Sequence, residues 1–508
     1  MAVPYTDAER AEGQRMMIAE GIFSRAMEGV TGGVILAAFA LALGASDIVI
    51  GLLAAIPFLA QLAHVPAVAL LARFPDRKPM TVWLCGLARL LFFVLALLPF
   101  TTIPVPPLVI LTGFLVTYTL MGMLSGAAWQ VWVRELVPRE SMGRYFGRRM
   151  AILSTVGLVT LLAAGQFLSW SEGNPLFPGL TRFTVLFVLG GLLGCVSTYL
   201  LTRAPSLPAP MPATPHSVHE ALKRPFGDGN FRRLLLFLGT WGFAANLALP
   251  FVTVVLLRTL GYGLGVVTLL AAASQVANIV GFRLWAPLTD RFGNKPVLYL
   301  AASTFLLAIL TWVALPKVQS PWVLGGITFV HLALGLATAG IDLASSNVVM
   351  KLAPDDDTPA YLASASVVKA VATGIAPLLG GLVAALLSDT SFLLQLGFAQ
   401  GEEANLVTAL RIAHYDFLFL AAGILGLYAL HRLLGFEEVG EAPPEAVVRA
   451  MRRDVGQLSS IGGMRQFAHM ASYVVETAYR FEAAVGVKPT RRAPLAGPKP
   501  PPPDPKTR

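Results

Sequence analysis

Polar and small side chains recur along one apolar stretch in the second half of the chain, at steps of four, three, four and three: His331, Gly335, Thr338, Asp342 and Ser345. With 3.6 residues per helical turn, these positions fall on one face of a helix. Asp342 could bind and release a proton there, because an isolated carboxylate in an apolar environment must be either paired or protonated. We interpret the stripe as one face of a polar cavity; the alternative for its small members is a close-packed helix interface.

A candidate partner for Asp342 is Lys369, which lies in the next apolar stretch on one face with Ser366 and Thr373. A buried Asp–Lys pair that breaks on protonation would couple proton movement to a conformational change. The alternative is a static ion pair that fixes the packing of two helices.

Other polar residues inside apolar stretches are further candidates for lining a cavity: Glu28, Gln130, Asn246, Gln275 and Asn278. Amide side chains at such positions either line a cavity or bond neighbouring helices together. Glu28 and Arg25 lie one turn apart, close enough to the start of their stretch to reach water. Arg89 is close enough to one end of its own stretch to do the same.

The elements that must position these residues are membrane-spanning helices. Hydrophobic residues make up 55% of the 508 positions and charged residues 13%, and the mean hydropathy is +0.67. A soluble chain carries about 25% charged residues. We expect an all-α integral membrane protein with twelve apolar spans: 21–44, 48–72, 79–99, 105–133, 150–170, 182–202, 233–257, 262–288, 296–315, 321–350, 359–388 and 413–434.

The connecting loops predict the orientation of these spans. Loops after even-numbered spans carry sixteen Lys and Arg residues, and loops after odd-numbered spans carry four. Basic loops stay on the cytoplasmic side of a membrane. We therefore expect a protein of the cell (inner) membrane with both termini in the cytoplasm. Its predicted parts are an N-terminus at 1–20, a six-helix bundle at 21–202, a linker at 203–232, a second bundle at 233–435 and a tail at 436–508.

The two predicted bundles carry the same landmarks at a constant offset. Lys78 and Pro79 match Lys295 and Pro296 at 217 positions, and three further pairs follow at 217 or 216: Pro99 with Pro316, Pro138 with Pro354, and Tyr145 with Tyr361. Each half has an even number of spans, so both copies have the same topology. Such parallel repeats, related by an axis along the membrane normal, are one layout of secondary transporters, with the substrate site between the halves.

The segment APLTDRFGNKP, from Ala286 to Pro296, resembles the loop motif G-x-L-x-D-R-x-G-x-K of the major facilitator superfamily, with alanine in place of the first glycine. The resemblance covers residues 20–435 and implies two pseudo-symmetric six-helix bundles. The residues concerned are Asp290, Arg291, Gly293 and Lys295, with Arg77 and Lys78 in the first half. The family implies that the motif aspartate helps to hold an outward-open state through neighbouring helices. The resemblance carries this role to Asp290, since the first half has Arg73 at the corresponding position.

Several catalytic signatures are absent from the sequence. It contains no G-x-x-x-x-G-K-[ST] phosphate loop, no H-E-x-x-H and no Cys/His cluster with metal spacing. We expect no enzyme activity, cofactor or metal. We expect a monomeric secondary active transporter that works by alternating access and binds a small molecule, protons and membrane lipids but no nucleic acid.

The export of amphipathic compounds is favoured, because few cations lie in the predicted cavity. Two alternatives stay open: a transporter of lipids or lysolipids, and a transport-silent scaffold or assembly factor. The tail bears on the second alternative. Its periodicity predicts amphipathic helices at 447–461 and 467–481, which lie on the membrane surface or bind a partner, before a Pro-rich end.

Overall fold

The computed structural model describes residues 6–64, 76–101, 104–138, 141–206, 218–400, 403–438 and 440. The two amphipathic helices predicted for the tail lie outside these residues. Among the described residues, eleven helical segments are long and apolar enough to cross a membrane, and Asp47–Ala63 is a twelfth, shorter apolar segment. The chain is therefore a multi-pass integral membrane protein, and the prediction of a twelve-span helical fold is confirmed.

In the described part of the first half, the chain forms seven helices and two short 3₁₀ turns: α1 (Asp7–Thr31), α2 (Val34–Ala42), α3 (Asp47–Ala60), η1 (Gln61–Ala63), α5 (Lys78–Leu97), η2 (Leu98–Phe100), α6 (Pro107–Leu136), α7 (Met142–Trp170) and α8 (Thr181–Arg203). After the linker helix α9 (Val218–Gly227), the second half contains α10 (Gly229–Val254) with the π-helical turn η4 (Val255–Thr259), α11 (Leu264–Phe292), α12 (Asn294–Ala314), α13 (Pro321–Leu352), α14 (Thr358–Leu386) and α15 (Asp416–Leu433).

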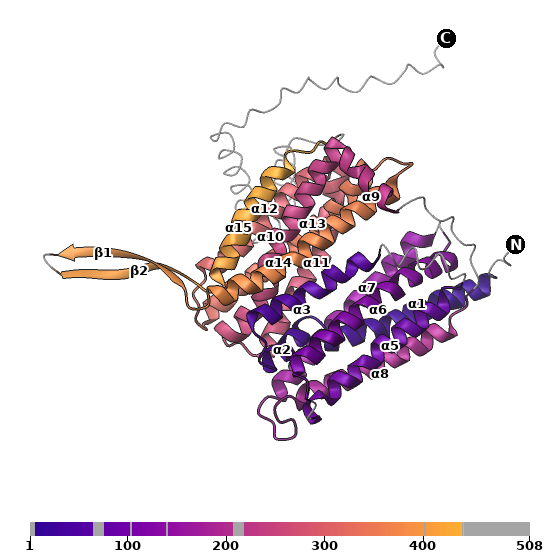
Figure 1. Cartoon of the computed structure of the whole chain (residues 1–508), viewed down its shortest axis with the longest axis horizontal. Helices are drawn as coiled ribbons and strands as arrows, with labels where there is room; N and C mark the ends of the chain where they lie inside the picture. The colour runs from indigo at the N-terminus through magenta and orange to yellow at the C-terminus, as the bar shows by residue number, and fades with distance from the viewer. Residues whose placement is uncertain are drawn as a thin grey trace, which may run out of the picture. The chain divides into compact units, whose positions relative to one another are not determined.

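The two halves pack their helices in the same pattern, as separate bundles coloured indigo to magenta and pink to yellow (Figure 1). In the first half, α1 packs against α7 and α8, α5 against α6 and α8, and α3 against α6. In the second half, α10 packs against α14 and α15, α12 against α13 and α15, and α11 against α13. Each of these five contacts of one bundle has its counterpart at the same place in the order of the spans of the other. The duplication predicted from the repeated landmarks is therefore present in the packing.

The repeated basic turn makes the same contact in both bundles. Lys78 Nζ donates to the carbonyl of Ala204, at the end of α8, at 2.7 Å. Lys295 Nζ donates to the carbonyl of Phe436, just beyond α15, at 2.6 Å. In each half the lysine at the start of the third span thus ties that span to the chain leaving the sixth.

The first helix begins well before the predicted span at residue 21. Thr6 and Glu9 form a reciprocal capping box at its start. Met17 is fully buried in a cluster that includes Trp132 and Tyr145. The charged side chains of this segment alternate with buried ones, so the residues predicted to be a separate polar N-terminus include the first half of α1. The helix then breaks at Gly32 and Gly33 before α2.

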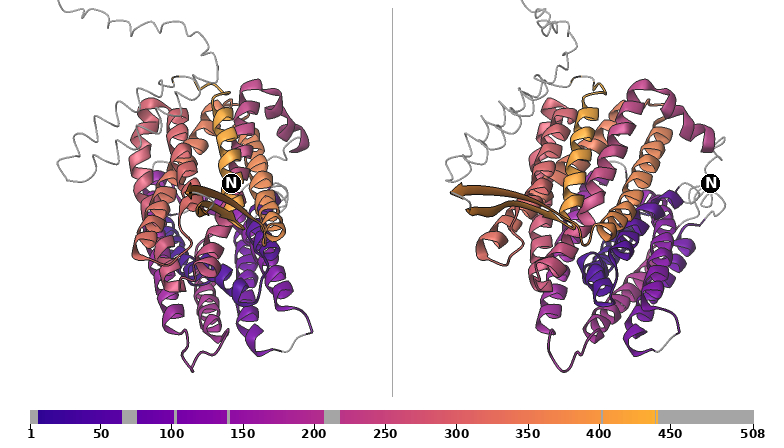
Figure 2. Two further views of the ribbon diagram at one scale, coloured as in Figure 1. Left: turned by 90° about the vertical axis from the view of Figure 1, so that its left-hand side faces the viewer. Right: turned by 60° about the vertical axis from the view of Figure 1, so that its left-hand side comes forward.

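A β-hairpin projects from the second bundle, between the predicted spans 359–388 and 413–434, where the sequence predicts no helix or strand (Figures 1 and 2). Strands β1 (Ser391–Gln400) and β2 (Glu403–Ala413) pair antiparallel, with a bulge at Leu394 and Gln395. The hairpin lies between α14 and α15. We call the end of the bundles from which it leaves the hairpin end, and the opposite end, which carries the Lys78 and Lys295 turns, the linker end.

Among the described residues, two helix pairs make most of the contacts between the bundles: α3 with α14 and α7 with α11. The joined segments lie toward the hairpin end. Gly51 of α3 and Gly381 of α14 let backbones touch, since a Cβ on Gly51 would overlap the carbonyl of Pro377 and a Cβ on Gly381 that of Asp47. In the second pair, a Cβ on Gly165 of α7 would overlap the hydroxyl of Thr268.

Candidate functional site

Polar contacts between the bundles converge on Asp47, which is buried at the hairpin end. Its carboxylate accepts hydrogen bonds from the Tyr415 hydroxyl at 2.7 Å and from Arg258 Nη1 at 3.1 Å. His414 Nε2 lies 3.1 Å from the other carboxylate oxygen. Three residues of the second bundle thus hold one acidic residue of the first. We call this cluster of Asp47, Arg258, His414 and Tyr415 the hairpin-end latch.

The structure brings Asp342 and Lys369 together on α13 and α14, away from the hairpin-end latch. Asp342 Oδ1 lies 3.9 Å from Lys369 Nζ, and the two side chains are 59% and 54% exposed. The predicted partners therefore meet, but the expectation that the pair is buried is wrong. A pair this open exchanges readily between the paired and the separated arrangement, since exposed ion pairs are worth only about 0–1 kcal/mol.

The rest of the predicted stripe packs against helices. A Cβ on Gly335 would overlap the carbonyl of Ser274 on α11. Asn278 Nδ2 donates to the Thr338 hydroxyl at 3.0 Å and to the Gly335 carbonyl at 3.3 Å. His331 is buried, with Nδ1 2.9 Å from the Ile327 carbonyl. Ser345 is also buried. For these residues the structure matches the helix-interface alternative instead of the cavity interpretation.

The remaining predicted residues do not converge on one site. Asn246 Nδ2 donates to the Gly242 carbonyl of its own helix at 2.9 Å, and Gln275 is half-buried on α11. Gln130 is exposed on α6. Glu28 pairs with Arg25 Nη1 at 2.6 Å, and both side chains are 45% exposed. Of this group only Glu28 lines the cavity described next.

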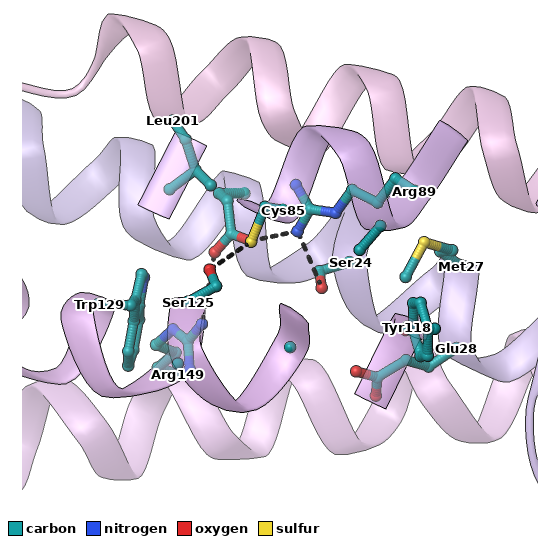
Figure 3. A pocket seen from close by; sticks show the side chains of 14 residues that line it. Ser24, Met27, Glu28, Cys85, Arg89, Tyr118, Ser125, Trp129, Arg149 and Leu201 are labelled. Carbon is teal, nitrogen blue, oxygen red and sulfur yellow. Dashed lines mark hydrogen bonds and ion pairs between the residues drawn. The ribbon is translucent and has the colours of Figure 1, made fainter. Parts of the chain in front are cut away.

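A cavity of about 250 Å³ lies inside the first bundle, among α1, α5, α6, α7 and α8 (Figure 3). Helices α1 and α6 supply most of its lining. We call it the N-terminal pocket; its polar and aromatic walls include Glu20, Glu28, Arg89, Tyr118, Trp129 and Arg149.

A buried charge cluster forms one wall of the N-terminal pocket. Glu20 Oε1 accepts hydrogen bonds from Arg89 Nη2 at 3.1 Å and from the Ser197 hydroxyl at 3.0 Å. Its other oxygen lies 3.6 Å from Arg149 Nη2. The side chains of Arg89, Glu20 and Arg149 are 5%, 7% and 12% exposed. The cluster therefore holds two guanidinium groups and one carboxylate away from water.

The sequence reading missed this cluster for identifiable reasons. Glu20 and Arg149 each lie one residue before a predicted span, 21–44 and 150–170, and the position of Arg89 predicts that it reaches the surface. A signal was nevertheless present: Gly13, Met17, Glu20, Ser24 and Met27 recur at steps of four, three, four and three. Steps of this size are typical of one face of a helix, so the pattern indicates that the first helix begins well before residue 21.

The predicted loop-motif residues lie at the linker end. Gly293 has φ +89°, a conformation that other residues resist, and it forms the turn between α11 and α12. Asp290 is exposed and makes no hydrogen bond or ion pair with any residue that the structure describes, while Arg291 lies over the Phe292 ring. In the first half, Arg77 is buried at the start of α5, and the Lys78 amide donates to Asp76 Oδ1 at 3.0 Å.

Glu438, which no sequence signal singled out, closes the second copy of this turn. Its carboxylate accepts hydrogen bonds from the amides of Asn294 and Lys295, at 2.9 and 2.8 Å, and pairs with Lys351 Nζ at 2.9 Å. A carboxylate at the first turn of a helix also interacts favourably with the helix dipole. Burial opposes its charge, but the hydrogen bonds from Lys351, Lys295 and Asn294 keep the pKa of Glu438 below its usual range.

The lowered pKa of Glu438 predicts how stability depends on pH. A carboxyl group with a depressed folded-state pKa stabilises the fold above its unfolded-state pKa, and this contribution is lost as the pH falls through its folded-state value. We expect Glu438→Gln to lower the free energy of unfolding by about 1–3 kcal/mol at neutral pH, because buried donors lose their acceptor. In thermal unfolding of detergent-solubilised protein, the gap to the wild type should shrink toward about pH 4. A gap that is constant with pH would contradict the assignment.

Comparisons with known proteins agree with this architecture. The sequence model described as the Major Facilitator Superfamily matches residues 21–341 and 236–481. No curated protein matches the chain in sequence. Among solved structures, a mutant of the nucleoside transporter NupG has 13% identity and a TM-score of 0.62, over 84% of this chain and 100% of that one.

Two further solved structures have similar scores. A D-xylose-proton symporter has 14% identity and a TM-score of 0.60, over 85% of this chain and 99% of that one. A bacterial homolog of the human lysosomal transporter Spinster, in an inward-facing and unoccupied conformation, has 15% identity and a TM-score of 0.55, over 93% of this chain and 99% of that one. At these identities the likeness shows a shared fold.

Proposed function

Because the chain belongs to the major facilitator superfamily, we propose that it is a secondary active transporter that carries a small molecule across the membrane by alternating access. The observation that supports this most strongly is the asymmetry between the two ends of the repeated bundles. Backbones of the two bundles touch toward the hairpin end, where the latch holds Asp47. The pairs Arg25–Glu28 and Asp342–Lys369 are about half exposed. Two rigid bundles that meet at one end can rock about that contact.

The basic loops support an orientation in which the linker end faces the cytoplasm of the cell, together with both termini. In that orientation the close contacts between the bundles lie toward the outside, which supports an inward-open state. Asp290 has no partner among the residues that the structure describes, and this fits such a state, since the family gives the motif aspartate a role in the opposite, outward-open state. Rocking the bundles the other way would break the latch and bring the linker ends together.

Proton coupling is assigned to the Asp342–Lys369 pair. The two groups lie on adjacent helices, α13 and α14, 3.9 Å apart, and their side chains are about half exposed. Protonation of Asp342 would remove its attraction for Lys369, and closure of the linker end would make the charged form more costly to keep. A proton bound before closure and released after it would link the pH gradient to the rocking motion.

Asp342→Asn tests this assignment, because asparagine keeps the shape but cannot titrate. We expect protein reconstituted in vesicles to lose at least about tenfold of its substrate-dependent proton flux, measured with a pH-sensitive dye; general acid–base groups are worth about this much or more. Asp355→Asn, in the loop between the same two helices, is the matched control and should transport normally. Undiminished proton flux in the Asp342 variant would refute the role of Asp342 in proton coupling. It would not contradict the proposal of alternating access.

A further inference from the structure

The buried cluster on the wall of the N-terminal pocket carries an excess positive charge. Arg89 and Arg149 both pair with the single carboxylate of Glu20. The other carboxylate on the pocket wall, Glu28, is already paired with Arg25 at 2.6 Å. Among the described residues around the pocket, three guanidinium groups therefore face two carboxylates. A buried charge without a counter-charge is costly, so a pocket of this kind is suited to an anion.

A second and independent observation concerns the hydrogen-bond donors of the pocket. The indole Nε1 of Trp129 is buried and has no acceptor among the residues that the structure describes. Buried indole N–H groups normally find a partner. The hydroxyl of Tyr118 belongs to another pocket-lining side chain. The pocket lining therefore includes one indole donor that needs an acceptor as well as a charge that needs a counter-charge.

Apolar and aromatic side chains supply part of the remaining walls. The Arg149 guanidinium lies over the Trp129 ring, 4.5 Å from its centroid. Met27, Ala88, Leu201 and the ring of Tyr118 add apolar surface to the lining. Figure 3 shows Trp129 and Arg149 on one side of the pocket and Tyr118 and Glu28 on the other. A cavity of about 250 Å³ suits a molecule of small-metabolite size.

We propose that the N-terminal pocket binds a small amphipathic organic anion, a monocarboxylate with a flat apolar body. Its carboxylate accepts hydrogen bonds from Arg149 and the Trp129 indole, and its body lies between the rings and the aliphatic side chains. This inference deepens the proposed function, on which it rests in treating the bound anion as the transported substrate. It also revises the expectation that few cations line the cavity, because the candidate cavity residues, which included Glu28 and Gln130 of the first half, did not include Arg89 or Arg149.

The first test measures binding alone, with the purified full chain in detergent. Benzoate, phenylacetate and hexanoate are each compared with the amide of the same skeleton by thermal shift, since a ligand that binds only the folded state raises the unfolding temperature. We expect at least one carboxylate to raise it and its amide to have no effect. If every carboxylate behaves like its amide, the proposal is wrong.

Variants then locate the site by titration calorimetry with the carboxylate that gives the largest shift. Trp129→Phe keeps the ring and removes the donor, and should weaken binding about tenfold, the usual effect of one hydrogen bond to a charged group. Arg149→Gln removes the excess positive charge and leaves Glu20 paired with Arg89, so it should weaken binding by at least tenfold as well.

Arg149→Lys keeps the charge and should retain part of the affinity. Arg283→Gln, exposed on α11, is the control and should bind as the wild type does.

The same carboxylate in a vesicle uptake assay separates this proposal from the proposed function. Binding that is lost in the pocket variants, without any uptake by the wild type, would uphold the anion site and overturn transport of that anion. Uptake of carboxylates that is unchanged in Trp129→Phe and Arg149→Gln would uphold transport and overturn the site. Loss of both binding and uptake in the variants is the expected result.

Discussion

Valine at Gly51 or at Gly381 is expected to abolish most transport while the protein still folds. In the state described here, a Cβ at either position overlaps a backbone carbonyl of the opposite bundle, that of Pro377 or of Asp47. A backbone group cannot rotate away as a side chain can, so the two bundles must separate. Overpacking of this kind costs about 1–3 kcal/mol, and a shift of that size changes the population of one state by about 5- to 150-fold.

The clash exists only when the hairpin end is closed, which is why the prediction concerns transport and not folding. Each variant is therefore measured twice: by initial uptake rate in vesicles and by thermal unfolding in detergent. Gly113→Val is the matched control, since it places the same β-branched residue in α6 with no atom within 4 Å of the new Cβ. Wild-type uptake rates in both interface variants would show that transport does not require this closure.

The second large effect is expected for Glu20→Gln, which should lower the free energy of unfolding by about 3–5 kcal/mol. The substitution keeps the size of the side chain and removes the charge that Arg89 and Arg149 share at 3.1 and 3.6 Å. Two guanidinium groups would then stay buried without a carboxylate. The measurement is denaturant or thermal unfolding of the solubilised protein.

Two comparisons isolate this effect from a general intolerance of α1. Glu28→Gln changes a carboxylate on the same helix whose pair with Arg25 is 45% exposed, and it should cost no more than about 1 kcal/mol. Combining Glu20→Gln with Arg149→Gln leaves one unpaired guanidinium instead of two, so the double variant should lose less stability than the sum of the two single changes. Equal costs for Glu20→Gln and Glu28→Gln would show that the buried cluster contributes no special stability.

The fold could be predicted from the sequence because its cause is simple and repeated. Apolar stretches long enough to span a bilayer, interrupted by basic loops, leave few alternatives to a helical membrane bundle. The constant offset between Lys78 and Lys295 predicts two like halves, and both lysines make the same contact in the structure. A tight turn at Gly293 could also be predicted, because a positive φ depends on the residue being glycine and not on distant contacts.

The site was predicted less well, because it depends on which polar residues meet in space. Asp342 and Lys369 could be paired from helical periodicity alone, but their exposure depends on how far the bundles separate. Glu20 could not be identified as a buried helical residue, because hydropathy detects only the apolar part of α1. The helix itself begins at Asp7. The hairpin was missed for a related reason: its strands are too short and too mixed in polarity to resemble a span, and pairing between Ser391 and Ala413 joins residues that no local pattern links.

In both bundles the basic turn is bonded to the chain that follows the sixth helix. The two copies differ in which of these segments supplies the carboxylate. In the first bundle the carboxylate, Asp76, belongs to the turn, and it accepts a hydrogen bond from Ser206 beyond the sixth helix at 2.8 Å. In the second bundle the turn supplies Asn294, and the carboxylate, Glu438, comes from beyond the last helix. An ancestral gene that doubled would have begun with identical partners in both copies. The reversal therefore records two separate histories of compensating substitutions, and a chimera that joins the turn of one copy to the terminal segment of the other would place either two acids or none at the joint.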